Sequence, residues 1–300
     1  MDVFHTIIFL YAIILIPFYH HTHTPSKALI VFEYVRDIFK KRIFSLEAAQ
    51  KTALLAWMVK LFFAPLMIVW FTDHFITVIN NLYLSSIDIS LLSTDFLLFF
   101  NKHLFWVCFT LILSFDVFFF TLGYLIESPR LKNTIKSVEP TILGWAVVLA
   151  CYPPFNTYTT SLIGWYSRDF PMFSDPSLHI VLNGMILLLM GIYASASISL
   201  GWKASNLTNR GIITSGAYSI VRHPAYITKN LAWWIGGLPL LIGNIQTEQW
   251  KHFCIVLFSL LAWSGIYYLR AITEERHLSK DPEYRQYKAH VRYKFIPGIW

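Results

Sequence analysis

The side chains best suited to chemistry gather in the stretch TSGAYSIVRHPAYITKN, residues 214–230, of an otherwise apolar chain. Gly216 favours a tight turn there, and Pro224 favours the first turn of a helix, where a missing N–H costs nothing. Arg222 and His223 then stand at the start of that helix, where free backbone N–H groups and the helix dipole favour an anion. The stretch predicts either a polar site at the mouth of an apolar helix or an interfacial anchor at headgroup depth.

A second polar group, Arg270, Glu274 and Glu275, stands where an apolar stretch gives way to a charged, aromatic tail, RAITEERHLSKDPEYRQYKAHVRYKFIPGIW. Arg270 and Glu274 are four residues apart on the predicted helix and could form an exposed ion pair. Glu275 lies on a different face, near Tyr268, so we expect it to face a cavity. Because a disordered tail would contain fewer aromatic residues, we expect this tail to fold back against the rest of the chain.

Together these segments resemble the isoprenylcysteine carboxyl methyltransferase family and its phospholipid N-methyltransferase relatives. The resemblance rests on TSGAYSIVRHPAY, EERHL and YRQYKAHVRYKFIPGIW. It implies a catalytic core at 201–300, made of a cofactor loop, two transmembrane helices and the tail. Residues 1–200 would then form N-terminal transmembrane helices, and they carry no matching motif. The resemblance further implies a pocket for S-adenosylmethionine that faces the cytoplasm.

The resemblance also assigns roles to individual residues. Those that match cofactor-binding positions are Tyr218, Arg222, His223, Tyr226, Glu274, Glu275 and Tyr287. Arg270 matches an arginine that serves the reacting substrate, so Arg270 and Glu275 are the predicted catalytic residues. A carboxylate can bind the ammonium of the cofactor, Arg or His its carboxylate, and tyrosines its rings. Methyl transfer from a sulfonium needs an aligned nucleophile and the exclusion of water, and no metal.

Lys229 and Asn230 depart from the prenylcysteine type, in which small or aromatic residues usually continue the helix. Lys229 lies five residues after Pro224, or about 7–8 Å along the helix axis. At that depth the lysine could extend back to the headgroups. It could instead act with Asn230 and Arg270 as the substrate-binding group for an acidic, lipid-borne head group. The expected acceptor is lipophilic: a prenylcysteine-like carboxylate, a lipid amine or a thiol.

Sterol and steroid reductases are the alternative class. They share Arg-His-Pro-x-Tyr and a tail similar to YKFIPGIW, and they would bind NADPH to deliver hydride. Their segment before Arg-His-Pro usually has a Trp-Ser lead-in, whereas TSGAY is the methyltransferase form. A non-catalytic lipid-binding protein would leave the clustered Tyr, Arg, His and Glu side chains unexplained. The favoured prediction is therefore a membrane methyltransferase that uses S-adenosylmethionine.

Long apolar segments must position these residues. Hydrophobic residues make up 56% of the chain and charged residues only 14%, against about a quarter charged in soluble proteins. Because a spanning helix needs roughly 17–25 mostly apolar residues, the sequence predicts an all-α, polytopic integral membrane protein with about seven transmembrane helices. The predicted spans are 3–19, 52–79, 104–126, 141–163, 178–200, 225–243 and 252–272. Pro153 and Pro154 interrupt the fourth span.

Basic residues alternate between the loops of this arrangement. Of the 24 Lys and Arg residues, 19 lie in loops 20–51, 127–140, 201–224 and 270–300, and three lie in loops 80–103, 164–177 and 244–251. The positive-inside rule then places the active site and the C-terminus in the cytoplasm and the N-terminus outside. The membrane would be a bacterial inner membrane or the endoplasmic reticulum. The net charge of +7 thus indicates topology and contact with membrane lipids, and no nucleic-acid partner.

Between the first two spans, apolar residues recur every three or four positions from Ala28 to Phe39. This pattern predicts an amphipathic helix near 27–42, lying either on the cytoplasmic headgroups or on a soluble partner.

Isolated polar residues elsewhere carry weaker predictions. Asp116 is a charge at membrane depth, and it is either a site residue or a buried partner of Lys60 or Lys229. The histidines at positions 20, 21 and 23 lack a partner cluster, so we expect no metal site.

Overall fold

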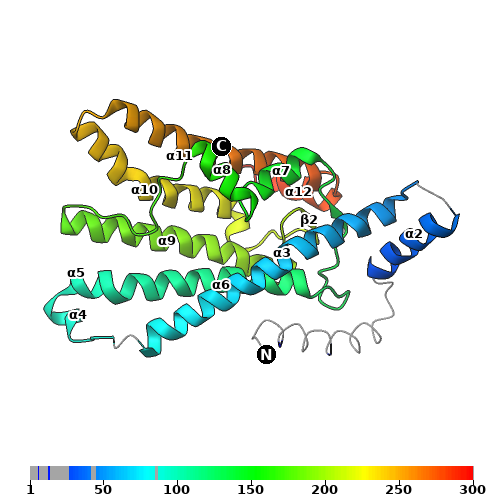
Figure 1. Ribbon diagram of the computed structural model, residues 1–300, viewed down its shortest axis with the longest axis horizontal. Helices are drawn as coiled ribbons and strands as arrows, with labels where there is room; N and C mark the ends of the chain where they lie inside the picture. The colour runs from blue at the N-terminus through cyan, green and yellow to red at the C-terminus, as the bar shows by residue number, and fades with distance from the viewer. Residues whose placement is uncertain (1–5, 7–12, 14–26, 42–44, 85–86, 300) are drawn as a thin grey trace.

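The computed structural model describes residues 27–41, 45–84 and 87–299, together with Thr6 and Ile13 (Figure 1). The predicted span at 3–19 and the histidines at 20, 21 and 23 lie outside the described residues. The helices are α2 (Lys27–Lys41), α3 (Ala48–Ile79), α4 (Leu91–Thr94), α5 (Phe96–Phe99), α6 (Phe105–Leu125), α7 (Ile142–Leu149), α8 (Phe155–Ile163), α9 (Pro176–Leu200), α10 (Pro224–Gln246), α11 (Trp250–Leu278) and α12 (Pro282–His290). Two short strands, β1 (Ser137–Val138) and β2 (Thr208–Asn209), pair antiparallel, with Ser137 opposite Asn209.

Capping residues and prolines set where the helices begin. At α9, the Asp175 side chain accepts a hydrogen bond from Leu178 N at 2.7 Å, and Pro176 occupies the first turn. These are the usual residues at those positions, because a capping oxygen satisfies a free N–H and proline has none to lose. Helix α10 begins at Pro224 as the sequence predicted.

Four helical segments are long and apolar enough to cross a membrane: Ala48–Leu82, Phe96–Leu125, Pro176–Lys203 and Trp250–Leu278. Only 28–33% of their apolar windows is buried inside the protein. Leu61, Leu188 and Phe258, for example, are 63%, 65% and 58% exposed. Faces this apolar suit lipid and not water. The chain therefore has the architecture of an all-α, multi-pass membrane protein, with four such helices in its described part and not the predicted seven.

The predicted fourth span, 141–163, is wrong as a single helix. Helix α7 ends at Leu149 and α8 begins only at Phe155, with Pro153 and Pro154 in the turn between them. Proline cannot donate a backbone hydrogen bond and clashes with the preceding helical turn, so it divides this segment. Helix α10 is continuous, but it is not among the four segments apolar enough to span, and Lys229, Asn230 and Pro239 lie within it.

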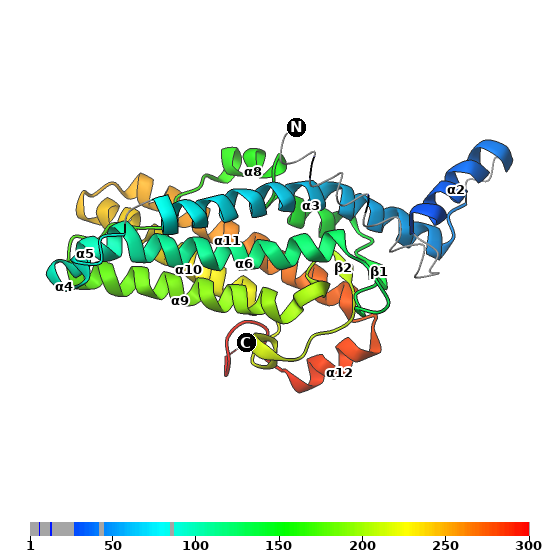
Figure 2. The ribbon, with the colours of Figure 1, turned by 90° about the horizontal axis from the view of Figure 1, so that it is seen from below.

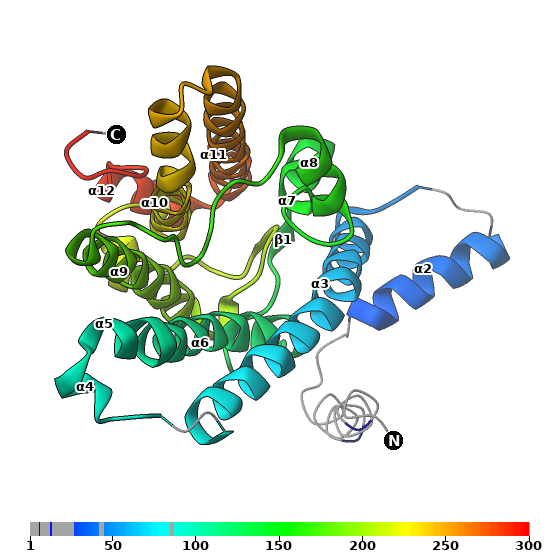
Figure 3. The same cartoon turned by 60° about the vertical axis from the view of Figure 1, so that its left-hand side comes forward.

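After α8, an extended segment at residues 164–175 runs between the helices to the start of α9 (Figure 3). The Gly164 carbonyl accepts hydrogen bonds from Ser259 Oγ at 3.1 Å and Trp263 Nε1 at 2.9 Å. Further along, Arg168 N donates to Gly236 O at 3.2 Å. A Cβ on Gly236 would lie 2.3 Å from Arg168 O, so only glycine permits this approach. Non-helical backbone at this depth is thus satisfied by protein groups.

The helices form a ring when the molecule is viewed along the bundle (Figure 3). Contacts run from α3 to α6, then to α9, α10, α11 and α7, and β1 packs against α3. Helix α2, the β1–β2 pair and α12 lie at one end, whereas the α4–α5 corner and the α10–α11 turn lie at the other (Figures 1 and 2). The lysine- and arginine-rich loops therefore share one end of the bundle, which we call the basic end.

Helix α2 confirms the predicted amphipathic helix, and it packs against α3. Its Leu29, Phe32 and Phe39 side chains are exposed. Lys27 at its start forms an ion pair with Glu127, which also accepts from Lys60 Nζ at 2.7 Å. Burial alone would raise the pKa of Glu127, but the two ammonium groups outweigh burial and lower it to about 2. Glu127, and not Asp116, is therefore the partner of Lys60.

Candidate functional site

The Arg222–His223 segment joins α10 to the C-terminal tail. Arg222 N donates to Tyr293 O and His223 N to Lys294 O, both at 3.0 Å. Pro224 follows at the first position of α10, so these backbone groups lie just outside the helix and are free to pair with the tail. Side chains of α12 and the segment after it, Tyr284, Tyr287 and Val291, form a small buried cluster with Ile212, Tyr218 and Leu278. The tail thus folds back, as its aromatic content predicted.

Glu275, on α11, lies at the centre of a group of cations from the start of α10 and from the tail. Its Oε1 is 2.8 Å from Arg222 Nε and 3.2 Å from His223 Nε2. Its Oε2 is 3.2 Å from Lys288 Nζ and 3.7 Å from Lys294 Nζ. The carboxylate is buried, and its opposite charges come from the start of α10 and from the tail. Its position is that of a structural tie between these segments.

Arg222 makes further hydrogen bonds to the same tail. Besides Glu275, its Nη1 donates to Val291 O at 2.8 Å and to Arg292 O at 2.5 Å. The predicted anion site at the start of α10 therefore contains an arginine whose guanidinium already binds the tail. Buried charges require this kind of pairing, because an unpaired one is costly to remove from water.

A cavity that is partly open to its surroundings lies within the helix ring. Its lining includes Tyr267, Arg270, Glu274 and His277, which repeat along one face of α11. The other lining residues are Phe120, Glu139, Val148, Tyr152, Tyr193, Ser197, Leu200, Ser205, Asn206, Leu207, Thr208, Tyr218, His223, Ala225, Tyr226, Lys229, Thr273 and Leu278.

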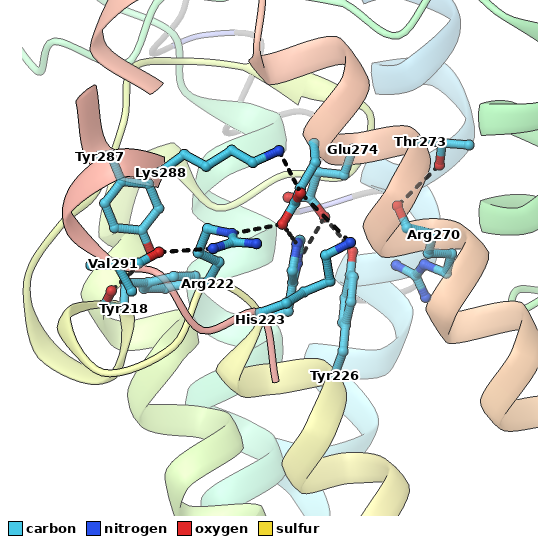
Figure 4. A network of polar contacts seen from close by, with 12 residues as sticks. Tyr218, Arg222, His223, Tyr226, Arg270, Thr273, Glu274, Tyr287, Lys288 and Val291 are labelled. Carbon is cyan, nitrogen blue, oxygen red and sulfur yellow. Dashed lines mark hydrogen bonds and ion pairs between the residues drawn. The ribbon is translucent and has the colours of Figure 1, made fainter. Parts of the chain in front are cut away.

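Glu275 is not among the residues that line this cavity, so the expectation that it would face a cavity is wrong. On a helix of 3.6 residues per turn, positions 267, 270, 274 and 277 share a face, and 275 falls on the side turned toward the tail. Glu274 is the carboxylate that lines the cavity, and its Oε2 accepts a hydrogen bond from Tyr226 OH at 2.7 Å (Figure 4).

Arg270 is a buried cation in the cavity wall, only 4% exposed. Its guanidinium carbon lies 4.8 Å from the ring centroid of Tyr267 and 5.0 Å from that of Tyr226. Nη2 donates to Asn206 Oδ1 at 3.0 Å, and Nε has no hydrogen-bond partner among the described residues. Within this described part the exposed Arg270–Glu274 ion pair does not form. Aromatic faces stabilise such a cation, but they do not neutralise it.

Lys229 also turns toward the cavity and not back to the headgroups. Its Nζ lies 5.0 Å from the ring centroid of Tyr193 and 5.6 Å from that of Trp233. The Tyr193 hydroxyl in turn donates to Asp116 at 2.8 Å, and Ser197 donates to the same carboxylate. Asp116 is therefore held by hydroxyl groups behind the cavity wall. We call the part of the cavity near Lys229 and Arg270 the deep end.

Asn230 does not line the cavity, contrary to the sequence prediction that paired it with Lys229. Its Nδ2 donates to Tyr226 O at 2.9 Å, one turn earlier on the same helix. Adjacent positions on a helix point about 100° apart, and here Lys229 is directed into the cavity and Asn230 away from it.

The predicted cofactor-binding residues divide between this cavity and a second hollow of about 610 Å³ that adjoins it. Tyr218, His223 and Glu274 line both, Tyr226 lines only the first, and Arg222 and Tyr287 line only the second. The Tyr287 hydroxyl donates to Tyr218 O at 2.8 Å. Burial raises the pKa of both Tyr218 and Tyr287, so both are neutral phenols.

The sequence did not identify the side chains that segments before residue 201 contribute. Glu139 and Val148 come from the β1–α7 region, Tyr152 follows α7, and Tyr193 and Ser197 come from α9. The core predicted at 201–300 is thus only part of the site. Across the described residues, no group of three His, Cys, Asp or Glu side chains is placed to hold a metal ion.

One protein family matches part of the chain. Residues 176–291 match a family described as "Protein of unknown function (DUF1295)". That family has a membrane fold similar to those of steroid 5-alpha reductases and isoprenylcysteine carboxyl methyltransferases. The match includes α9 to α12 and stops short of β1 and α7. No curated protein and no solved structure matches the chain.

Proposed function

We propose that this chain is an integral membrane methyltransferase that uses S-adenosylmethionine and acts on a lipophilic acceptor. The observation that carries the proposal is the distribution of charge along the cavity. Lys229 and Arg270 provide cations at the deep end. Nearer the basic end, Glu274 provides a carboxylate with no lysine or arginine partner among the described residues, beside Glu139, whose charge Arg276 neutralises. A polar, cationic donor suits the acidic region, and an acceptor with an anionic head group suits the deep end.

The fit of the donor can be tested against the residues present. S-adenosylmethionine has a sulfonium and an ammonium, a carboxylate, a ribose and an adenine. Glu274 offers a carboxylate whose side chain is 43% exposed, and His223 Nδ1 lies 3.8 Å from it. Tyr218 and Tyr226 offer ring faces beside the same region. These groups match the cationic and planar parts of the donor.

When bound, S-adenosylmethionine would supply an electrophilic methyl group. The protein has to hold the acceptor in line with that methyl and keep water out. Arg270 and Lys229 can hold an anionic acceptor through charge, and the rings of Tyr152, Tyr226 and Tyr267 around Arg270 exclude water. An ionised carboxylate or thiolate needs no base for this transfer, so the cations act by positioning.

The balance of charge favours this donor over NADPH, which carries a diphosphate and a further phosphate. Two acidic and two basic side chains line the principal cavity, so it is not strongly cationic. Arg222, the arginine nearest the predicted anion site, is already bound to Glu275 and the tail.

One observation supports the reductase alternative. Lys203 and Arg210 line the adjoining hollow, and both could bind phosphate groups.

The proposal includes an orientation. Of the 24 Lys and Arg residues, 19 lie in the segments 20–51, 127–140, 201–224 and 270–300, and the described parts of these segments lead to the basic end. By the positive-inside rule, this end and the C-terminus face the cytoplasm. The polar donor would then enter from the cytoplasm, where it is soluble, and the acceptor would come from the membrane.

Titration of the purified protein in detergent with S-adenosylhomocysteine, and separately with NADPH, tests the proposal. We expect saturable binding of S-adenosylhomocysteine and none of NADPH at comparable concentration. Binding of NADPH alone would replace the methyltransferase with the reductase alternative. Binding of neither would reject a nucleotide-dependent enzyme of either class.

A further inference from the structure

Glu139 is a buried carboxylate in the cavity wall with one oxygen unused. The side chain is 3% exposed. Its Oε1 accepts hydrogen bonds from Thr141 N at 3.1 Å, from Arg276 Nη2 at 2.9 Å and from the Thr141 hydroxyl. Its Oε2 is buried and has no hydrogen-bond partner among the described residues. Because a buried, bare carboxylate oxygen destabilises a fold, this atom calls for a ligand.

The start of α7 is shaped to hold this carboxylate. A Cβ on Gly144 would lie 2.3 Å from Glu139 Cγ and 2.8 Å from Oε1, so any larger residue would displace the group. Thr141 caps the helix by accepting from Gly144 N at 3.2 Å while its own N–H donates to Glu139. The carboxylate is therefore fixed by three elements: the turn before α7, the first turn of α7, and Arg276 on α11.

Glu139 marks the outer end of the cavity, toward the basic end of the bundle. Its partner Arg276 lies six residues beyond Arg270 on α11, which is about 9 Å along the helix axis. The neighbouring His277 lines the same wall and contacts Ser137 Oγ at 2.9 Å. A ligand that reached from Arg270 to Glu139 would thus extend along most of the α11 face.

The charge of Glu139 is already neutralised by Arg276, whereas Glu274 has no lysine or arginine partner within the described chain. The unpaired carboxylate is the better partner for an ammonium group, and the paired one is better suited to a neutral donor. Sugar hydroxyls are neutral donors, and a buried carboxylate oxygen is a strong acceptor for them. Adenine offers an exocyclic amine, but its planar ring suits the tyrosine side of the cavity.

We propose that Glu139 Oε2 accepts a hydrogen bond from a ribose hydroxyl of the nucleoside cofactor and so positions that cofactor in the cavity. The inference rests on the proposed function. It assigns a binding role to a residue outside the segment that matches the protein family. It also makes the β1–α7 region part of the cofactor site.

The test is calorimetric binding of S-adenosylhomocysteine and its 2′-deoxy and 3′-deoxy analogues to the purified protein in detergent. In the wild type, we expect at least one deoxy analogue to bind roughly 10–100-fold more weakly, as for the loss of a charge-assisted hydrogen bond. In Glu139→Gln, the amide oxygen stays with Thr141 N and Arg276, so the amide NH₂ faces the ligand. We expect this variant to bind the parent compound more weakly, because a neutral hydrogen bond from the amide replaces the charge-assisted one. It should also lose less affinity than the wild type when the deoxy analogue is used.

The matched control is Glu283→Gln on α12, where the exposed carboxylate pairs with Lys136 at 3.3 Å. It should leave every binding constant unchanged. Equal binding of the parent compound and both deoxy analogues by the wild type would overturn the inference, and this comparison needs no folded variant. Normal binding of the parent compound by Glu139→Gln would also overturn it, while leaving the proposed function intact. Absence of wild-type binding to S-adenosylhomocysteine would reject the proposed function and this inference together.

Discussion

The position of Glu275 leads to a prediction that separates a structural tie from a cofactor contact. Glu275→Gln removes the charge that Arg222 faces at 2.8 Å, and Arg222 is itself only 9% exposed. Breaking a buried ion pair from one side typically costs about 3–5 kcal/mol, because the remaining charge is left uncompensated. The matched comparison is Lys288→Met. Lys288 pairs with the same carboxylate, but the lysine side chain is 45% exposed. Exposed pairs contribute about 0–1 kcal/mol, so this variant should change stability little.

Two measurements follow in detergent: the thermal unfolding midpoint and amide hydrogen exchange of residues 282–294. Glu275→Gln should lower the midpoint and speed exchange in the tail, because Arg222 also holds Val291 O and Arg292 O. Lys288→Met should leave both nearly unchanged. If Glu275→Gln keeps wild-type stability and tail exchange but loses binding of S-adenosylhomocysteine, then Glu275 contacts the cofactor and our assignment of it to the tail is refuted.

Three further predictions concern the deep end, the α2 contact and the orientation. Lys229→Met should raise the KM for an anionic acceptor and leave the affinity for S-adenosylhomocysteine unchanged, and steady-state kinetics with unchanged acceptor KM would rule out a role for Lys229 in substrate binding. Because the folded-state pKa of Glu127 is about 2 against an ordinary value of 4.5, its contribution to stability is present above pH 4.5 and is lost as the pH falls toward 2. Unfolding midpoints should therefore fall less steeply with acid in Glu127→Gln than in the wild type, and parallel curves would contradict this. A C-terminal reporter that is active only outside the cytoplasm should give no signal, whereas a strong signal would reverse the proposed orientation.

Hydropathy and charge predicted the long continuous helices better than the segment that is divided into two short ones. The spans predicted at 178–200 and 252–272 correspond to α9 and α11 because a long apolar run has few alternatives to a helix. The segment 141–163 has the same average character, yet its two prolines and its packing against α11 divide it. Average hydropathy cannot distinguish a continuous spanning helix from a segment of similar composition that prolines divide.

The candidate site was predictable where the chemistry lies close together in the sequence. Arg270 and Tyr226 both line the cavity, and each lies in or beside a motif that the sequence already marked. The choice between Glu274 and Glu275 depended on which side of α11 the tail covers, and that is a tertiary contact. Glu139 lies far from the motif residues in the sequence, and only the β1–β2 pairing and the start of α7 bring it to the cavity. No sequence spacing connects Glu139 with the motif residues.

The extended segment at 164–175 constrains the order in which the chain can assemble in the membrane. Among the described residues, Ser259 and Trp263 donate to its Gly164 carbonyl and Gly236 O accepts from Arg168 N, and all three belong to helices synthesised later. Bare peptide groups are not tolerated in hydrocarbon, so this segment cannot settle at its final depth before α10 and α11 arrive. We therefore expect the Gly164 carbonyl and the Arg168 N–H to stay hydrated during biosynthesis until α10 and α11 dock. The final packing of this segment thus depends on the second half of the chain.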